Sequence, residues 1–227
     1  MPTEMELRKL CRLFLLVALL PLASCNGLFE GIYDSPDDMP DGDDSGFGFV
    51  GEGSTPATSR IYIDATSYTS WIYLDFHNRK ATALEIEEGE EAEPLEWDLA
   101  IHRYDAKTHS GLVLASGLKE LSEAAALTSR PGGAWTADVW TTDKISIDMS
   151  HMMEGYIIYA ESFYNPVLSG WLNVDTSEMP PIYTLDPQVY IVEFADGTHA
   201  ALRLMDFMDK AGVKGYMTID YIYPLAF

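Results

Sequence analysis

Large apolar and polar residues alternate along most of the chain beyond Arg60. The segment RIYIDATSYTSWIYLDF shows this alternation twice, with Thr66 and Ser67 between its two halves. The same period of two returns in EWDLAIHRYDAKT, DKISIDMSHMM, SGWLNVDT, QVYIVEFADGTHAALRLMDF and GYMTIDYIYPL. Because successive side chains of a β-strand point to opposite faces of a sheet, this period predicts half-buried strands.

Turn and helix signals complete the pattern. The pair Asp196-Gly197 between two alternating runs predicts a β-hairpin with a type I′ turn. Only GLKELSEAAAL, residues 117–127, has helical spacing, and it is short. Thirteen Tyr and five Trp suit half-buried pleated surfaces. The sequence therefore predicts an all-β fold, a single domain of packed antiparallel sheets with long loops over residues 60–227.

The N-terminus has the pattern of an export signal. A basic start, Arg8 to Arg12, precedes the apolar run LFLLVALLPLAS, which has the length of a signal-peptide core and is too short to span a bilayer as a stable helix. The run ends in Leu22-Ala23-Ser24-Cys25, which resembles a lipobox. This resemblance implies that residues 1–24 are a lipoprotein signal peptide and that the chain is cleaved before Cys25 and lipidated on it.

Residues 25–59 have the composition of a tether. They include SPDDMPDGDDSGFGFVGEGSTP, and eight acidic residues with no basic one lie between Glu30 and Glu52. Such a segment buries too little apolar surface to order itself, and its like charges repel and extend it. The acidic residues close behind Cys25 also resemble a surface-export signal of bacterial lipoproteins, which implies display on the cell surface.

Charge and cysteine content exclude several functions. The net charge of −22 argues against nucleic acid and against electrostatic docking on anionic lipid, so we expect membrane contact only through the lipid anchor. Cys11 leaves with the signal and Cys25 carries the lipid, which rules out a disulfide or a Cys₂His₂ zinc site. No GxSxG, HExxH or GxxxxGK[ST] motif occurs, and His77, His102, His109 and His199 are scattered singly. We therefore predict that the protein is not an enzyme.

The segment DMSHMMEGY places three methionines and a histidine within five residues, from Met149 to Met153. If the segment is a strand, Met149, His151 and Met153 share one face with the apolar residues before them. Met152 instead follows Asp148 and Ser150 on the polar face, so it breaks the pattern. On the residues alone, packing of methionine in the core remains the simpler interpretation.

A second methionine stands out in SGWLNVDTSEMPPIY. Met179 follows a polar stretch and precedes two prolines, which hold the loop extended and stiff. Thioethers are soft, neutral donors that suit Cu(I) or haem iron, and either ligand remains open beside simple packing. Haem would also need an apolar slot, for which the residues between the two loops are candidates: Tyr156, Tyr159, Phe163, Tyr164 and Trp171.

Five segments resemble one known family in the same order along the chain: IDATSYTSWIYLDF, WDLAIHRYDAKTHSG, SGWLNVDTSEMPPIYTL, VEFADGTHAALRL and TIDYIYPL. They are similar to the HmuY family of haem-binding lipoproteins, the haemophores of anaerobic Gram-negative bacteria. The similarity runs from about Arg60 to Leu225, and WDLAIHRYD is its most specific part. It implies an all-β fold that grips haem between two loops, with one axial ligand from each.

The resemblance also implies site residues. The founding member uses two histidines, of which the first falls near His151 and the second falls in TSEMPP, where no histidine is present. A variant group within the family resembles this sequence in using two methionines instead, which here would be Met179 with Met152 or Met153. The implied cofactor is therefore haem (iron protoporphyrin IX), its iron held by Met152 and Met179, with Met153 and His151 as alternatives for the first ligand. Candidates for the haem propionates are the scarce cations Arg103, Lys107 and Lys144.

The implied role is a haemophore, lipid-anchored in the outer membrane and exposed on the cell surface. It would take haem from host haemoproteins and deliver it to a TonB-dependent outer-membrane transporter. Two other functions fit the residues: a Met-rich copper-binding protein, and a surface lipoprotein that binds a glycan or host protein through its aromatic side chains.

Overall fold

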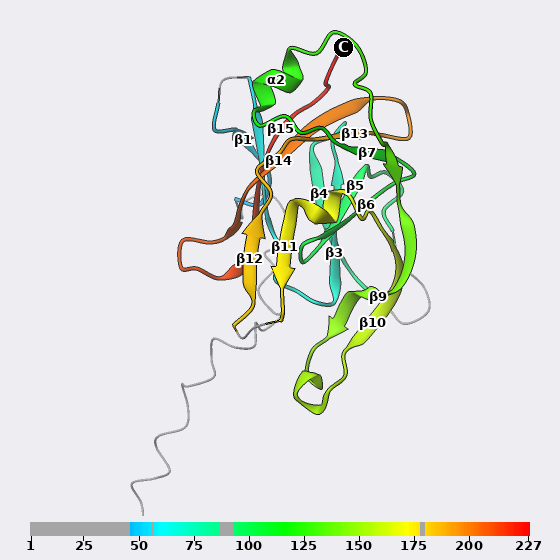
Figure 1. The fold of residues 1–227 in the computed structure, drawn as a ribbon, viewed down its shortest axis with the longest axis vertical. Coiled ribbons are helices and arrows are strands. Elements are labelled where there is room, and N and C mark those ends of the chain that lie inside the picture. Colours follow the sequence, from blue (N-terminus) through cyan, green and yellow to red (C-terminus); the bar gives the residue numbers. More distant parts are fainter. Residues whose placement is uncertain (1–45, 56, 87–92, 178–179) are drawn as a thin grey trace, which may run out of the picture. The chain divides into compact units, whose positions relative to one another are not determined.

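Antiparallel strands make up nearly all of the regular structure (Figure 1). The computed structural model describes residues 46–55, 57–86, 93–177 and 180–227. Its strands are β1 (Gly48–Glu52), β2 (Ser59–Asp64), β3 (Ser70–Asp75), β4 (Lys80–Glu85), β5 (Leu99–His102), β6 (Asp105–Thr108), β7 (Leu112–Ala115), β8 (Thr136–Ala137), β9 (Val139–Asp148), β10 (Ile158–Tyr164), β11 (Leu172–Asp175), β12 (Ile182–Leu185), β13 (Tyr190–Glu193), β14 (His199–Met208) and β15 (Lys214–Ile222). The described helices are short: α2 (Leu121–Ala125) and the 3-10 helices η3 (Met152–Glu154) and η4 (Leu168–Trp171).

Two larger sheets form the body of the domain. One has seven strands in the order β1-β2-β15-β14-β13-β7-β8, and the other has four in the order β4-β3-β5-β6. All their pairings are antiparallel. The two halves of RIYIDATSYTSWIYLDF form β2 and β3, which belong to different sheets. The predicted all-β fold of packed antiparallel sheets is confirmed.

The main core consists of apolar residues from both sheets. Ile61 and Ile63 of β2 pack in the same cluster as Ile72 and Leu74 of β3, and all four are buried. These residues occupy alternate positions of their strands, as the period of two predicts. Each fully buried side chain of this size contributes about 1.5–3 kcal/mol.

Each larger sheet is also covered on a second face. The helix α2 packs Leu121 and Ala124 against a cluster that includes Ile191 and Ala201 of the seven-stranded sheet. The predicted helix is confirmed, although it is shorter than residues 117–127. On the four-stranded sheet, Ile145 of β9 is buried with a cluster of aromatic residues and one alanine: Trp71, Tyr73, Trp97 and Ala100.

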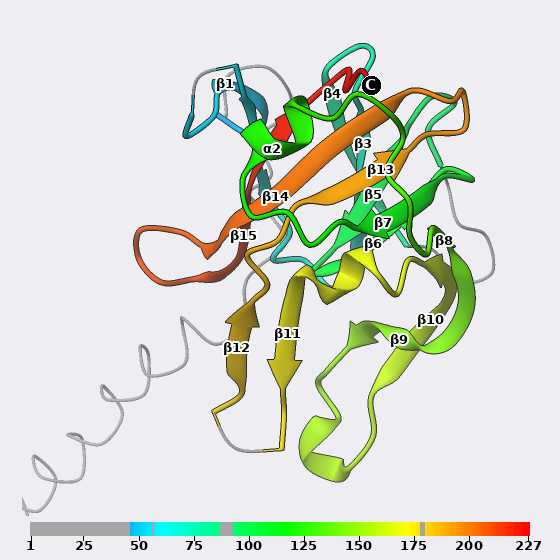
Figure 2. The ribbon, with the colours of Figure 1, turned by 45° about the horizontal axis from the view of Figure 1, so that its top comes forward.

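Two β-hairpins project from the body side by side (Figures 1 and 2). We call the β9–β10 hairpin, residues 139–164, the first finger, and the β11–β12 hairpin, residues 172–185, the second finger. Each is a separate two-stranded sheet. Trp140 pairs with Phe163 in the first finger, and Asp175 pairs with Ile182 in the second.

Three local expectations were wrong. The strand β1 lies within the stretch expected to be a tether, and it pairs with β2 despite its glycines. Of Asp196 and Gly197 only the glycine has a positive φ, +83°, so the predicted hairpin forms without a type I′ turn, which needs positive φ at both residues. The strand expected to continue through Met153 ends at Asp148.

The described residues all fall within one unit, Pro40–Phe227. Among them, no helix is long and apolar enough to cross a bilayer. The expected signal peptide, residues 1–24, and the expected lipidation site, Cys25, lie outside the described residues.

Candidate functional site

The tip of the first finger is a tight, hydrogen-bonded turn. The carboxylate of Asp148 accepts the N–H of Ser150 at 2.7 Å, and this bond holds the pKa of Asp148 below its usual range. The chain then turns through η3, where Glu154 donates its N–H to the carbonyl of His151. Gly155 ends η3 with φ +91°, a conformation that glycine adopts without strain. Local hydrogen bonds therefore define the backbone that presents His151 and Met152.

The tip of the second finger begins in the same way. The carboxylate of Asp175 accepts the N–H of Ser177 at 2.9 Å, and hydrogen bonds from the Ser177 hydroxyl and N–H lower its pKa. Both fingers thus leave their first strand through an Asp-x-Ser turn, in which the side chain substitutes for a backbone acceptor. The predicted ligand Met179 lies outside the described residues, between this turn and the start of β12 at Ile182.

The candidate first ligands differ in exposure and in contacts. Met152 is 42% exposed and Met153 is 90% exposed, whereas Met149 is partly buried. The ring of His151 stacks on Tyr156 with centroids 4.6 Å apart, and its Nδ1 lies 3.2 Å from a carboxylate oxygen of Glu154. Core packing does not explain Met152 and Met153, because both side chains are exposed at the fingertip.

Exposed apolar side chains are concentrated on the fingers. Of the twelve large hydrophobic residues exposed in the described part of the chain, nine lie on the two hairpins. Large apolar side chains that gather in an exposed region of a soluble protein usually mark a site of interaction. The nine are Val139, Trp140, Met152, Met153, Tyr156, Ile158, Tyr159, Phe163 and Ile182.

The residues predicted to line an apolar slot divide into two groups. Tyr156, Tyr159 and Phe163 are exposed on the first finger, while Tyr164 packs partly against the aromatic cluster below it. Trp171 is fully buried in the main core, where its Nε1 donates to the carbonyl of Tyr104 at 2.7 Å, so its proposed place in the slot was wrong.

The sequence analysis overlooked Trp140, Ile158 and Ile182. Each is exposed although it lies within a strand. Their apolar character was a visible signal, but the alternating pattern assigns such residues to a core. Only the placement of β9, β10 and β12 in two hairpins separate from the larger sheets shows that these side chains are exposed.

The three candidate cations have different environments. Lys107 is buried, with Nζ 3.0 Å from Glu93 and over the rings of Trp71, Tyr73 and Trp97, so it is a poor candidate for contact with a haem propionate. Arg103 donates to the carbonyl of Thr66 and lies over the ring of Tyr68. Lys144 is exposed on β9 of the first finger. Lys144 is therefore the candidate that best fits a ligand held by the fingers.

Comparison with known proteins identifies the class. The sequence model of the HmuY protein family matches residues 67–221. The chain therefore belongs to the HmuY family. No curated protein matches it.

Solved structures agree with this assignment. A protein of Bacteroides vulgatus, described as HmuY-like and haem-binding, is 51% identical, with 80% of this chain and 100% of that chain covered and a TM-score of 0.73. A protein of Bacteroides fragilis, described as a lipoprotein, is 47% identical over 81% of this chain and 98% of its own, with a TM-score of 0.74. The apo HmuY analogue of Tannerella forsythia is 25% identical over 72% and 94% of the two chains, with a TM-score of 0.61.

Proposed function

We propose that the protein is a haemophore that captures haem between the tips of its two fingers. The observation that carries this proposal is the concentration of exposed apolar side chains on two adjacent hairpins, one of which presents Met152 at its tip. Haem has a large apolar macrocycle and an iron that accepts axial donors, so it matches such a surface. Membership of the HmuY family supports the choice of ligand.

The axial ligands would be Met152 and Met179, one from each finger. Met152 is favoured over Met153 because it is less exposed, as expected for a side chain that faces the neighbouring finger. His151 is a weaker candidate because its ring is already stacked on Tyr156 and its Nδ1 lies beside Glu154. The surrounding aromatic residues would cover the macrocycle, and Lys144 would meet a propionate.

This function is binding and transfer, not catalysis. The haem source would be host haemoproteins, and the recipient would be a TonB-dependent transporter of the outer membrane. The protein would remain at the cell surface through a lipid on Cys25. The lipoprotein description of the Bacteroides fragilis relative supports the anchor.

A haemin titration followed by the visible spectrum tests the ligand assignment. Wild type should bind one haem with a shifted Soret band, and Met152→Ala should weaken binding by on the order of tenfold, about 1.4 kcal/mol. Met179→Ala should do the same. Met153→Ala and His151→Ala serve as matched controls from the same turn and should bind like wild type. Binding that responds to Met153 or His151 instead would move the first ligand to that residue.

The same preparation tests the copper alternative. Uptake of Cu(I) without any Soret shift from haemin would replace the haem proposal with a copper site formed by the fingertip methionines. Binding of neither ligand would leave the apolar fingers as a surface for a glycan or host protein. Either result would overturn the haemophore proposal.

The anchor has its own test. Metabolic labelling with a palmitate analogue should mark the wild-type protein in the membrane fraction. Cys25→Ala should lose the label and be released from the outer membrane. Label retained on that variant would show that Cys25 is not the lipidated residue.

A further inference from the structure

Two aspartates face each other across the end of the four-stranded sheet, outside both fingers. Asp75 ends β3, and Asp98 immediately precedes β5. These strands pair with Leu74 opposite Leu99, and the N–H of Asp98 donates to the carbonyl of Leu74 at 2.9 Å, which holds Asp98 beside the end of β3. Like charges that lie close together on neighbouring strands are destabilising.

Burial makes this juxtaposition more costly. Asp75 is 7% exposed, and the side chain of Asp98 is 13% exposed. Burial raises the pKa of Asp98, and the charge of Asp75 adds to that increase. A cation between the two carboxylates would offset the repulsion.

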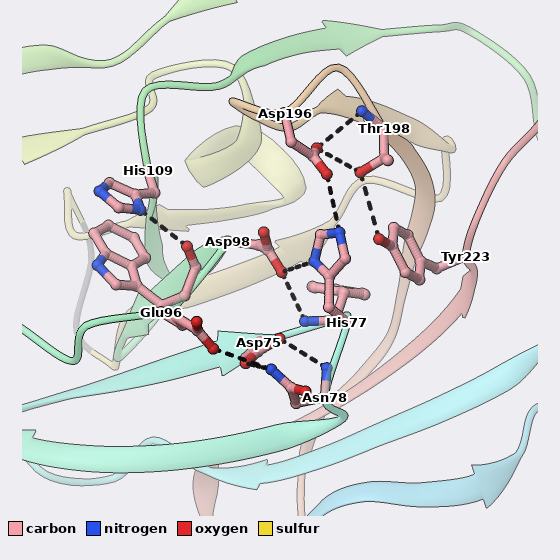
Figure 3. Close-up of polar contacts among 11 residues, drawn as sticks. Asp75, His77, Asn78, Glu96, Asp98, His109, Asp196, Thr198 and Tyr223 are labelled. Atoms are coloured by element: carbon pink, nitrogen blue, oxygen red, sulfur yellow. Dashed lines mark hydrogen bonds and ion pairs between the residues drawn. The ribbon is translucent and has the colours of Figure 1, made fainter.

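His77 lies beside this pair, in the turn between β3 and β4. Its Nδ1 is 3.4 Å from Oδ2 of Asp98, and its Nε2 is 3.0 Å from Oδ2 of Asp196 in the β13–β14 turn (Figure 3). One potential ligand atom from each of Asp75, His77 and Asp98 lies within 4.8 Å of the other two. Three side chains from two paired strands and a turn therefore converge on a space that a single ion would fill.

We propose that Asp75, His77 and Asp98 form a binding site for a divalent transition-metal ion, with zinc as the ion that fits best. Zinc binds imidazole nitrogen and carboxylate oxygen, and a site with three protein ligands leaves a fourth position for water. A soft Cu(I) ion would instead prefer sulfur, which this site does not offer.

The position of Asp196 suits a metal-bound histidine. Histidines that bind metals nearly always donate their other ring N–H to a carboxylate, carbonyl or water, which fixes the tautomer. When Nε2 donates to Asp196, Nδ1 keeps its lone pair, and that atom is the one near Asp98. Asp196 is itself held by the N–H and hydroxyl of Thr198, at 2.9 and 2.7 Å.

The carboxylates retain the capacity to bind an ion. Asp98 accepts the N–H of Phe76 on Oδ2 at 2.7 Å, and no residue among those described donates to its Oδ1. Asp75 accepts the N–H and side-chain amide of Asn78, one on each oxygen, which leaves a lone pair on each.

The site also functions without metal as an ion cluster. Burial lowers the pKa of His77, but the carboxylates of Asp98 and Asp196 outweigh burial and hold it above its usual range. In the metal-free protein, the two ring nitrogens of His77 lie beside the carboxylates of Asp98 and Asp196.

Calorimetric titration of the full, haem-free chain with Zn²⁺ tests the proposal. Wild type should bind zinc, and His77→Gln should lower the zinc affinity by at least about 30-fold. Asp196→Asn should lower it by about tenfold, which is in the range for removal of an outer partner of a metal ligand. His199→Gln is the matched control, since His199 contacts a single carboxylate, Glu193, at 3.1 Å. That variant should bind zinc like wild type.

Several outcomes would overturn the proposal. The proposal is wrong if the wild-type protein takes up no zinc. It is also wrong if wild type and His77→Gln bind zinc with equal affinity. Circular dichroism should show native spectra for both surface variants, because His77 and Asp196 are each partly exposed. Haem takes no part in this titration, so its result is independent of the proposed haemophore function.

Discussion

Asn165 donates a hydrogen bond from its side-chain amide to the carboxylate of Asp138, at 2.9 Å, and these two residues flank the two strands of the first finger. Asp138 precedes β9, and Asn165 follows β10. The same carboxylate accepts the N–H and hydroxyl of Thr108 in β6, at 2.6 and 3.1 Å. One aspartate therefore joins both ends of the finger to the four-stranded sheet.

Asn165 is the central residue of this connection. Its side chain is fully buried, and its Oδ1 accepts the N–H groups of Val167 and Leu168 at 3.1 and 3.0 Å. Its own N–H donates to the carbonyl of Ala106 at 2.6 Å. The base of the finger is thus fixed to the four-stranded sheet by polar contacts.

We predict that Asn165→Ala lowers the free energy of unfolding by about 2–4 kcal/mol, because several buried donors and acceptors lose their partner at once. Urea denaturation measures the change. Asn173→Ala in β11 is the matched control, because Asn173 is exposed, and its effect should stay within about 0.5 kcal/mol. A value for Asn165→Ala as small as that of the control would show that the network does not stabilise the finger.

A second prediction concerns stability against pH and starts from His102. Burial lowers the pKa of His102 to about 4, and its Nε2 lies 2.8 Å from the carbonyl of Tyr68. Between pH 6.5 and about 4 the unfolded chain binds the proton and the folded chain does not, so this residue destabilises the fold as pH falls through that window. The full effect is about 3 kcal/mol.

Asp105 acts in the opposite direction. Burial raises its pKa to about 6, so between the usual value near 4 and pH 6 the folded chain holds a proton that the unfolded chain lacks. Its contribution to stability therefore falls as pH rises through that window. Since the windows of Asp105 and His102 overlap, their effects partly cancel in the wild type.

Two variants separate these effects. As pH rises from 4 to 6, the free energy of unfolding of His102→Gln should fall relative to that of wild type. Over the same range, the free energy of unfolding of Asp105→Asn should rise relative to that of wild type. Urea denaturation at several pH values measures both slopes. Slopes equal to wild type in both variants would contradict the assigned pKa shifts.

A third prediction concerns the buried Lys107. Its Nζ lies 4.6 Å from the ring centre of Trp71, in surroundings that are mostly aromatic. Methionine has a similar length without the charge, and the partner carboxylate, Glu93, is 38% exposed and stays hydrated when the lysine is removed, so Lys107→Met should change stability by less than about 1.5 kcal/mol. Lys107→Ala leaves a cavity and should cost about 2–4 kcal/mol. Thermal unfolding measures both, and equal losses would show that the charge is essential.

The fold was predictable because its strands alternate clearly. Ile61, Ile63, Ile72 and Leu74 follow the period of two and lie in the core. The strand β1 was missed because Gly48 and Gly51 interrupt its pattern and acidic residues surround it. Its pairing with β2 is a tertiary effect, which local composition does not reveal.

The site was only partly predictable. Met152 was recognised because it breaks an alternation, and the structure places it at a fingertip, although the strand itself ends earlier. Trp171 was misplaced because proximity in sequence to a loop does not specify burial. The cluster was missed because strand pairing and a turn bring Asp98 beside Asp75 and His77, which precede it by 23 and 21 positions.

The final prediction concerns the oxidation state of the bound iron. Two thioethers are soft and uncharged, so they stabilise Fe(II) relative to Fe(III) more than two imidazoles do. If Met152 and Met179 hold the iron, the protein should bind reduced haem more tightly than oxidised haem, by on the order of tenfold or about 1.4 kcal/mol. Haem titrations under dithionite and in air measure the difference.

Oxidation of the ligands themselves gives the matched control. Methionine sulfoxide places a polar S=O group where the thioether sulfur donated, so mild peroxide treatment of the haem-free protein should weaken binding. Met153, the more exposed of the two methionines in η3, should oxidise first. A Met153→Leu variant removes that reaction. Further oxidation should still abolish haem binding by this variant, because Met152 and Met179 can still be oxidised. Two results would rule out axial methionines and return His151 to the first position. One is a haem affinity that is unchanged after complete oxidation of Met152 and Met179, and the other is an equal affinity for both iron states.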